Sequence, residues 1–329
     1  MNPIAFIVGG HVVYWNAIVI ALGVAACFCL SMALFTAHGG RAEALWILLP
    51  LAILLSLPLA RFINWYCHSE KYLGFWKAMT DYSRGDYCLA GVILGTALAG
   101  LVVKLLGFTQ NLRRPYDCLA PGAALGIALI RLSEIFTNAD RAKAVVTDAR
   151  YQRLPFSTEI IGSGEWRVAT FFFQFLGMLL IFVLLLRFFD KRRRWPMKAG
   201  QPRDGHVALM FLTWLGALDL VADSSRYDAS FLRLNGFVSM VQIVSAVTML
   251  LVLVIYSRRS IKANGLRPSL WLLWIGFFLA VGLVGFLEWL VQRHGTWHLS
   301  VYTLMSLSCL TMAYMVYRAY LTVCAARRK

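Results

Sequence analysis

Charged residues are scarce in this chain, and acidic ones are the scarcest. Only 15% of the 329 residues are charged, whereas 60% are hydrophobic. A soluble globular domain usually carries about a quarter charged residues. The scarcity of charge therefore argues against an ordinary soluble enzyme and indicates a membrane protein.

The sequence also lacks the motifs by which common catalytic sites are recognised. It has no G-x-S-x-G elbow, no P-loop, no H-E-x-x-H motif and no Ser-His-Asp order. The 7 cysteines form no C-x-x-C pair, and no histidine spacing suggests zinc. We therefore expect no metal and no cofactor, and covalent chemistry would take its nucleophile from a substrate.

Apolar runs of about 20 residues, the length that crosses a bilayer as a helix, recur along the whole chain. Backbone groups find no water inside a bilayer, so these runs must be helical. About nine are expected, at 12–35, 45–65, 87–108, 118–138, 168–189, 206–222, 237–257, 269–290 and 298–320. The predicted fold class is an all-α polytopic membrane protein.

Basic residues outnumber acidic ones, 32 to 16, and they gather in alternate loops. Lys and Arg concentrate at 187–203, at 258–267 and at the C-terminus, which the positive-inside rule assigns to the cytoplasm. The N-terminus is therefore expected outside. The run "RFFDKRRRW" is expected to anchor this topology rather than to bind nucleic acid. The segment 139–167, the longest between spans, is expected to form a small cap on the outer side.

Ionisable residues inside spans are few, and each is costly in lipid without a partner. The span at 118–138 carries Arg131 and Glu134, three apart and so on one helix face, followed by Asn138. Two interpretations remain open. The pair neutralises itself and holds the bundle together, or it binds a charged headgroup with Glu134 orienting the guanidinium.

The span at 206–222 ends in "LGALDLVADSSRYD", which is rich in carboxylates. Asp219, Asp223 and Arg226 stand at i, i+4 and i+7, so they share one stripe of a helix. An alternative is a helix end with its charges in water, which suits Arg226 and Asp228. It suits the deeper Asp219 less well.

A third polar pair, Arg61 and Asn64, lies near the outer end of the span at 45–65. Arg61, Arg131 and Arg226 are thus expected at one depth. An arginine fork binds phosphate through paired, charge-assisted hydrogen bonds. The phosphate most available at that depth belongs to a phospholipid headgroup, so the sequence predicts a phospholipid site.

Several segments carry spaced motifs in a consistent order. "DCLAPGAALGIALIR" at 117–131 fits D-x-x-A-P-x-x-x-L-G-x-x-x-x-R, "LGALDLVADSSR" keeps the spacing of Y-G-x-x-R-x-x-x-E-x-x-R, and "SMVQIVS" at 239–245 fits S-M-x-Q-x-x-S. "YWNAIVIALG", "LARFINWY" and "LAGVILG" add shorter likenesses. Together they resemble the prolipoprotein diacylglyceryl transferase family of bacterial inner membranes. The expected division is a transferase-like membrane domain at 1–260 and two additional helices within 261–329.

This resemblance implies a phospholipid-dependent transferase in the bacterial cytoplasmic (inner) membrane. The diacylglyceryl group of phosphatidylglycerol passes to the lipobox cysteine of a preprolipoprotein signal peptide, a thioether forms, and glycerol phosphate leaves. No nucleic acid is expected as a partner. The expected catalytic residues are Arg131, Glu134, Asp223 and Arg226. The expected substrate-binding residues are Tyr14, Arg61, Asn64, Asn138, Asp219 and Gln242.

Three positions depart from the family pattern. Leu89 stands where the family has a histidine, Glu134 replaces an asparagine, and Asp219 replaces an arginine. Glu134 is a candidate for the missing base. The alternatives are a relative that binds phospholipid or lipoprotein signal peptides without catalysis, and a small-solute transporter that uses the buried charges.

Overall fold

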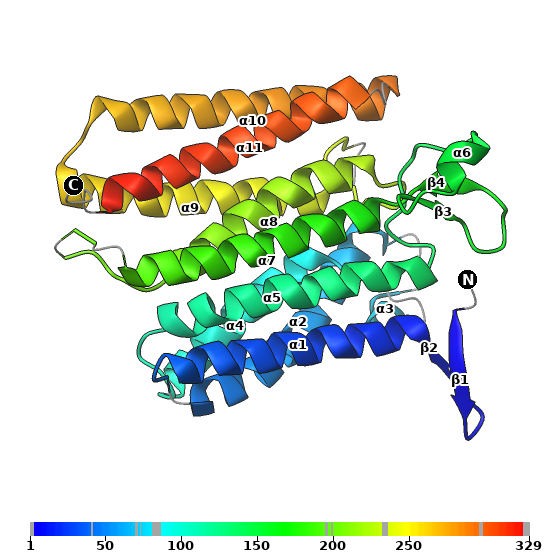
Figure 1. The fold of residues 1–329 in the computed structure, drawn as a ribbon, viewed down its shortest axis with the longest axis horizontal. Coiled ribbons are helices and arrows are strands. Elements are labelled where there is room, and N and C mark those ends of the chain that lie inside the picture. The colour runs from blue at the N-terminus through cyan, green and yellow to red at the C-terminus, as the bar shows by residue number, and fades with distance from the viewer. Residues whose placement is uncertain are drawn as a thin grey trace.

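The chain folds into a bundle of long helices, shown in Figure 1. The computed structural model describes residues 3–40, 42–69, 72, 74–80, 87–194, 197–198, 200–231, 236–295 and 299–324. The long helices are α1 Trp15–Ala37, α2 Ala42–Cys67, α4 Leu89–Leu105, α5 Arg113–Ser133, α7 Thr170–Arg194, α8 His206–Ser225, α9 Met240–Asn264, α10 Pro268–His294 and α11 Leu299–Val323.

The expected all-α polytopic membrane fold is confirmed. Among the described residues, 8 helices are long and apolar enough to cross a membrane, and α4 is a shorter apolar helix. The C-terminal boundary of one predicted span differs from the structure. The span predicted at 118–138 is helical only to Ser133 and continues as the 3-10 turn η3, Glu134–Phe136. Glu134 therefore lies beyond the α-helix that carries Arg131.

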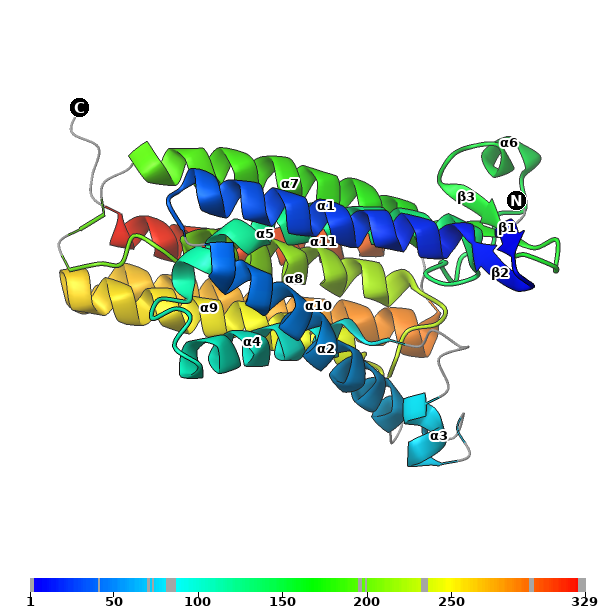
Figure 2. The same cartoon turned by 90° about the horizontal axis from the view of Figure 1, so that it is seen from below.

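A small cap covers one end of the bundle. It contains α6, Ala149–Gln152, and a hairpin of β3, Ser157–Glu159, with β4, Trp166–Val168. Figure 1 shows the N-terminal hairpin, β1 Ile4–Val8 with β2 His11–Tyr14, at this same end, and Figure 2 adds the short α3, Phe75–Thr80. We call this end of the bundle the cap end. The last helix, α11, ends at the opposite end of the bundle (Figure 1).

Glycines let two pairs of helices approach closely. A Cβ atom on Gly23 of α1 would lie 2.9 Å from the carbonyl oxygen of Gly126 in α5. A Cβ atom on Gly91 of α4 would lie 2.2 Å from the backbone nitrogen of Ala60 in α2. Small residues at such crossings allow backbones to pack directly in a membrane. The "PGAALG" and "LAGVILG" stretches therefore serve helix packing.

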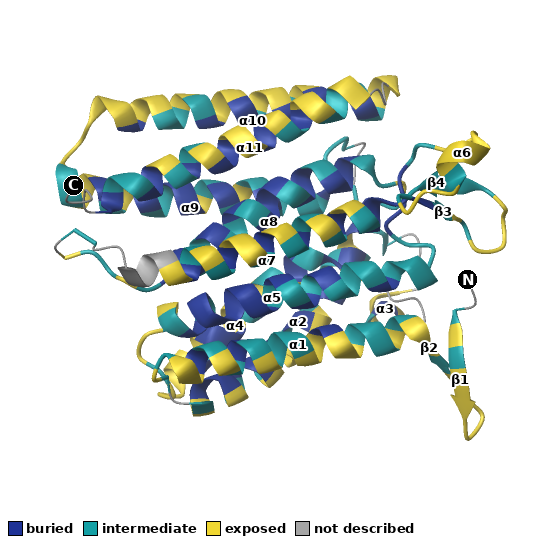
Figure 3. Cartoon of the chain, viewed as in Figure 1, coloured by how far each residue is buried: buried dark blue, intermediate teal, exposed yellow. Residues whose placement is uncertain are grey.

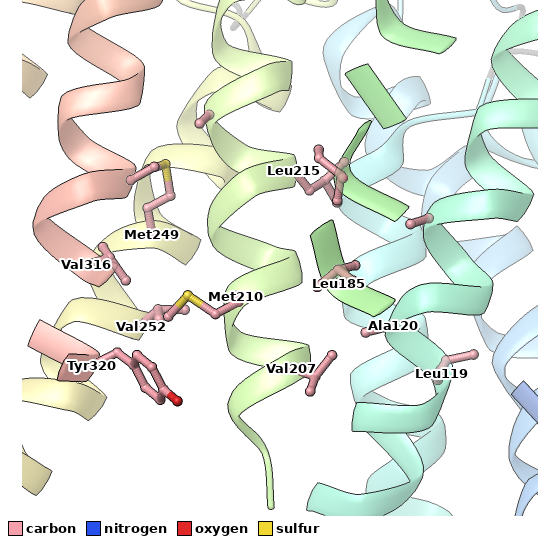
Figure 4. Packing of buried hydrophobic residues seen from close by; sticks show 14 of the residues in the cluster. Leu119, Ala120, Leu185, Val207, Met210, Leu215, Met249, Val252, Val316 and Tyr320 are labelled. Atoms are coloured by element: carbon pink, nitrogen blue, oxygen red, sulfur yellow. The ribbon is translucent and has the colours of Figure 1, made fainter. Parts of the chain in front are cut away.

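Helix α8 is the most enclosed of the long helices and packs against α5, α7, α9 and α11. Figure 4 shows Met210 and Leu215 of α8 among the buried side chains of its neighbours, including Leu185, Met249 and Val316. Exposed residues gather on the outward faces of α1 and α10 (Figure 3). Apolar outward faces suit contact with lipid rather than water.

Asp117, the first residue of the 117–131 motif, joins α5 to the beginning of α8. Its buried carboxylate accepts the backbone N–H of Gly205 at 2.7 Å and that of Ala208 at 2.9 Å. A carboxylate at a helix N-terminus satisfies free N–H groups and complements the helix dipole. This contact fixes the relative position of the two helices that carry the ionisable residues.

Candidate functional site

The ionisable residues of α5 and α8 meet at the cap end around one carboxylate, Asp140. Arg131 Nη1 donates to Asp140 Oδ2. Arg226 Nη2 lies 2.6 Å from Asp140 Oδ1. Asp140 is 2% exposed, so it is almost fully enclosed between the two guanidinium groups. Arg131 and Arg226, 95 positions apart (226 − 131), thus share one counter-ion.

Sequence reasoning did not include Asp140 among the site residues. Its backbone is in the left-handed region, with φ of 53°, which aspartate tolerates better than most residues. Its N–H donates to Asp228 Oδ2 at 3.2 Å, and its carbonyl accepts from Phe171 at 3.0 Å. One sequence feature could have pointed to Asp140: its carboxylate lies in the polar segment "TNAD", which begins six residues after Arg131 (137 − 131).

Arg226 is held by three carboxylates. Besides Asp140, its Nε lies 3.0 Å from Asp228 Oδ1, and its Nη1 lies 3.4 Å from Asp223 Oδ1. Burial alone would lower the pKa of Arg226, but the attraction of these carboxylates outweighs it and holds the pKa well above its ordinary value. Burial would raise the pKa of Asp228, yet Arg226 keeps it below the ordinary range. Arg226 therefore keeps its positive charge despite its burial.

The "SMVQ" motif ties α9 to this cluster. Ser239 Oγ donates to Asp223 Oδ2. Ser239 and Gln242 form a capping box at the start of α9, with Ser239 N donating to Gln242 Oε1 at 2.9 Å. Gln242 Nε2 also donates to the carbonyl of Leu220 in α8 at 3.2 Å. In this structure Gln242 joins two helices and holds Asp223 through Ser239.

Arg131 and Glu134 do not form the pair that their spacing suggested. Among the contacts of the described residues, Arg131 bonds Asp140, and Glu134 Oε2 accepts from Thr137 Oγ1 at 2.5 Å. The physical reason is competition from other partners: Asp140 pairs with the Arg131 guanidinium, and Thr137, at the C-cap of the 3-10 turn η3, donates to the Glu134 carboxylate.

Asp219 is buried beside this network without completing its own hydrogen bonds. It is 3% exposed, and its Oδ2 has no hydrogen-bond partner among the described residues. Its electrostatic neighbours are Arg131, Asp223, Arg226 and Asp140. Asp219, at the position where the sequence resemblance implies an arginine, therefore lies within the cluster.

Arg61 and Asn64 form contacts with the neighbouring α3 region. Arg61 Nε donates to the carbonyl of Ala78 at 2.8 Å, and its guanidinium lies 5.4 Å from the centre of the Tyr87 ring. Asn64 Nδ2 donates to the Tyr72 hydroxyl at 3.1 Å. The structure brings two of the three arginines to one carboxylate and gives the third these other partners.

Asn138 lies two residues before Asp140, and Tyr14 lies at the start of α1. Asn138 Oδ1 accepts from Arg141 Nη1 and from the backbone N–H of Ile161, each at 2.8 Å, so this side chain organises the cap. Tyr14 is exposed at the N-cap of α1, and the adjacent Trp15 stacks on Phe136 of η3 at 6.3 Å between ring centres.

Leu89 is the first residue of α4 and packs, half-buried, against the hydrophobic core. A leucine cannot exchange a proton, so this position supplies no base. Nor do the described residues contain a group of three or more His, Cys, Asp or Glu placed to hold a metal ion. The chemistry available at the cap end is that of carboxylates and guanidinium groups.

Comparison with known proteins places these residues in context. A model of the prolipoprotein diacylglyceryl transferase family matches residues 3–258. The phosphatidylglycerol–prolipoprotein diacylglyceryl transferase of Streptococcus equi subsp. zooepidemicus is 25% identical over 258 residues, which cover 75% of this chain and 93% of the relative. The enzyme of that name from Streptococcus agalactiae is 23% identical over 273 residues, which cover 79% of this chain and 97% of the relative.

These relatives are named as transferases, which supports a transferase role for this chain. They are bacterial, and the present chain has the helices of a multi-pass membrane protein. Helices α10 and α11 lie beyond the matched residues. Because the family model matches well over half of the sequence, the chain belongs to the prolipoprotein diacylglyceryl transferase family.

Proposed function

We propose that the protein transfers the diacylglyceryl group of phosphatidylglycerol to the lipobox cysteine of a preprolipoprotein at the bacterial cytoplasmic membrane. The observation that carries this proposal is the convergence of Arg131 and Arg226 on Asp140 at the cap end. Family membership supports the same reaction. The helices place this cation pair at the end of the bundle, where the sequence predicts the outer leaflet and its headgroups.

The reaction replaces a carbon–oxygen bond with a carbon–sulfur bond. The cysteine sulfur attacks the glyceryl carbon of the lipid, the bond to the phosphate oxygen breaks, and glycerol phosphate departs with the bonding electrons. The thiol proton passes to a carboxylate, for which Glu134 is the candidate at the edge of the cluster. Cationic donors aimed at the leaving phosphate stabilise the charge that develops on it.

Arg131 and Arg226 have different roles in this proposal. Among the described residues, Arg131 makes one side-chain hydrogen bond, through Nη1, whereas a guanidinium has five N–H donors. Its remaining donors can bind the lipid phosphate. Arg226 is already engaged by three carboxylates, so it positions Asp140 and Asp223.

The test incubates the purified protein with phosphatidylglycerol and a lipobox peptide. We expect a mass gain on the peptide cysteine and release of glycerol phosphate. Arg131→Ala should reduce the rate about 100-fold or more, since it removes a cation from the leaving group. Arg167→Ala is the matched control because Arg167 pairs with Glu165 in the cap, at 2.7 Å, outside the cluster. Full activity in Arg131→Ala would refute its role.

Leu89 favours a second candidate function. With leucine in place of the family's histidine, a relative that binds phospholipid or lipoprotein signal peptides without transfer is consistent with the site. A folded protein that retains the lipid or the peptide, but releases no glycerol phosphate and adds no mass to the peptide cysteine, would support this second function over the first. The buried charges alone give no comparable support to a solute transporter.

A further inference from the structure

Arg259 lies near the end of the bundle opposite the cap end, where α5 and α8 begin and α9 ends (Figure 1). It stands five residues before Asn264, the last residue of α9 (264 − 259). Its buried Nη1 atom has no hydrogen-bond partner among the described residues. Buried donors are almost always hydrogen-bonded, so this one points to an acceptor that the protein does not supply.

A second guanidinium group, that of Arg113, lies near Arg259. Arg113 is the first residue of α5, and its side chain packs against Gly205, the N-cap residue of α8. A Cβ atom on Gly205 would lie 3.3 Å from both Cβ and Cγ of Arg113. Arg113 is also an electrostatic neighbour of Arg259. Two like charges repel each other, and an anion bound to both would remove this repulsion.

The carboxylates at this end of the bundle have other contacts. Both oxygens of Asp117 accept backbone N–H groups at the start of α8. Asp190 and Asp204 also have contacts, and in the described part of the chain they form no ion pair with either arginine. The side chains outside that part that adjoin this end in sequence include no Asp or Glu, at positions 41, 191–196, 199 and 325–329.

Arg259 has a defined position between α9 and the start of α8. Its guanidinium lies 5.7 Å from the centre of the Tyr256 ring, which is fully buried. Gln201, from the segment that precedes α8, donates through Nε2 to the Arg259 carbonyl at 3.3 Å. The preceding residue, Arg258, is exposed, whereas Arg259 is half-buried. A basic residue that only anchors the topology needs no such enclosure, so Arg259 has a further role.

The chemistry of this end matches the phosphate of a lipid. Guanidinium groups bind phosphate through paired, charge-assisted hydrogen bonds. Basic pockets between membrane helices on the cytoplasmic side bind anionic headgroups, and the positive-inside pattern predicts the cytoplasm at this end. An exposed apolar segment stands five to eight residues before Arg113 (113 − 108, 113 − 105), namely Leu105, Leu106 and Phe108. Such a segment suits contact with acyl chains and favours a lipid over a water-soluble anion.

We propose that Arg113 and Arg259 form a second lipid site, which binds the phosphate of an anionic phospholipid in the leaflet opposite the cap end. The bound headgroup joins the beginning of α5 to the end of α9 beside the start of α8. The site involves no covalent step and does not depend on the proposed transfer. Because α5 carries Arg131 and α8 carries Asp223, a lipid at this end stabilises the helices that form the cap-end cluster.

The experiment measures lipid binding by the whole protein in detergent micelles. Cardiolipin, an anionic lipid with two phosphates, is added in one series, and phosphatidylcholine, which carries no net charge, is added in another. A ligand that binds only the folded state raises the midpoint of thermal unfolding. We expect cardiolipin to raise this midpoint and to be retained in native mass spectrometry about tenfold more than phosphatidylcholine. Inorganic phosphate at the same concentration should leave the midpoint unchanged.

Matched variants locate the bound lipid. Arg259→Gln and Arg113→Gln each remove one guanidinium and should lower cardiolipin retention about tenfold, because charge-assisted hydrogen bonds to the phosphate are lost. Arg258→Gln removes an exposed arginine one position away and should leave retention unchanged. Arg113 is exposed at the start of its helix, so if Arg259→Gln does not fold, Arg113→Gln still tests the site.

The outcomes also separate this site from the proposed function. Equal retention by the parent protein, Arg113→Gln and Arg259→Gln would overturn the inference, and so would an equal loss in Arg258→Gln. A loss confined to Arg131→Ala would place cardiolipin at the cap end and overturn it as well. An equal rise of the midpoint with inorganic phosphate would overturn the assignment to a lipid. Absence of transfer from phosphatidylglycerol, with cardiolipin retention that depends on Arg259, would overturn the proposed function alone.

Discussion

At the scale of single residues, Asp140 explains the arrangement of the site. It neutralises part of the charge on both Arg131 and Arg226, and it links the end of α5 to the end of α8. Two guanidinium groups this close would repel each other without a shared anion. The role of Asp140 is therefore electrostatic, and its left-handed backbone at φ 53° directs the side chain between the two arginines.

Asp140→Asn tests this role because asparagine accepts the same left-handed backbone while losing the charge. Removing one partner of a buried ion pair usually costs about 3–5 kcal/mol. We expect a clear fall in the midpoint of thermal unfolding in detergent. Asp148→Asn, at the N-cap of α6, is the control, with a loss of about 1 kcal/mol at most. Equal midpoints for the two variants would contradict the bridging role.

At the scale of elements, direct helix–helix contact positions the site. Gly91 and Gly95 of α4 face the backbone of α2, and Gly122 and Gly126 of α5 face α1. The "DCLAPGAALG" motif thereby combines two structural functions, since Asp117 also fixes the start of α8. Close packing of α5 on α1 leaves Arg131 at the end of a firmly held helix.

Gly95→Ala tests the close approach of α4 and α2. The added Cβ would lie 2.4 Å from Ser56 Cα, so the helices must separate, at a cost of about 1–3 kcal/mol. Gly282→Ala in α10 is a matched control, because its Cβ meets nothing within 4 Å. Alanine there should be neutral or slightly stabilising, since it favours helix more than glycine does. Thermal unfolding in detergent would measure both, and a stable Gly95→Ala would argue against the contact.

At the scale of the whole molecule, one of the two helices beyond the family match, α10, reaches the end of α8 beside the site. Gln292 of α10 donates from Nε2 to the carbonyl of Ser224 at 3.3 Å and to Glu288 Oε1 at 2.7 Å. Lys143 of the cap donates to Gln292 Oε1 and, at 3.4 Å, to the same Ser224 carbonyl. Ser224 lies between Asp223 and Arg226, so the end of α8 is held from both the cap and α10.

Gln292→Leu should weaken this support while leaving α10 apolar enough to cross the membrane. We expect a loss of about 1–3 kcal/mol of stability, because hydrogen-bond partners are left unsatisfied, and a several-fold fall in the transfer rate. Thr311→Ala on the exposed face of α11 is the control. An unchanged rate and stability in Gln292→Leu would show that α10 does not support the site.

Most of the fold could be predicted because its signals are local. Apolar runs long enough to span lipid are visible residue by residue, and the physics of unsatisfied backbone groups makes them helices. Helical spacing and the alternating topology also predicted that four ionisable residues lie near one another: Arg131, Asp219, Asp223 and Arg226. The end of α5 was less predictable, since the 3-10 turn at Glu134 depends on how Thr137 and the cap pack around it.

The sequence by itself determined that this is a helical membrane protein with basic and acidic residues concentrated near helix ends, because composition and periodicity are properties of the chain alone. Only the tertiary structure decided which charges pair. Asp140 lies in a polar segment outside the spans, and its two partners come from helices far apart in sequence. The energy of a charge depends on burial and on neighbours within a few ångströms, and only the folded chain specifies both.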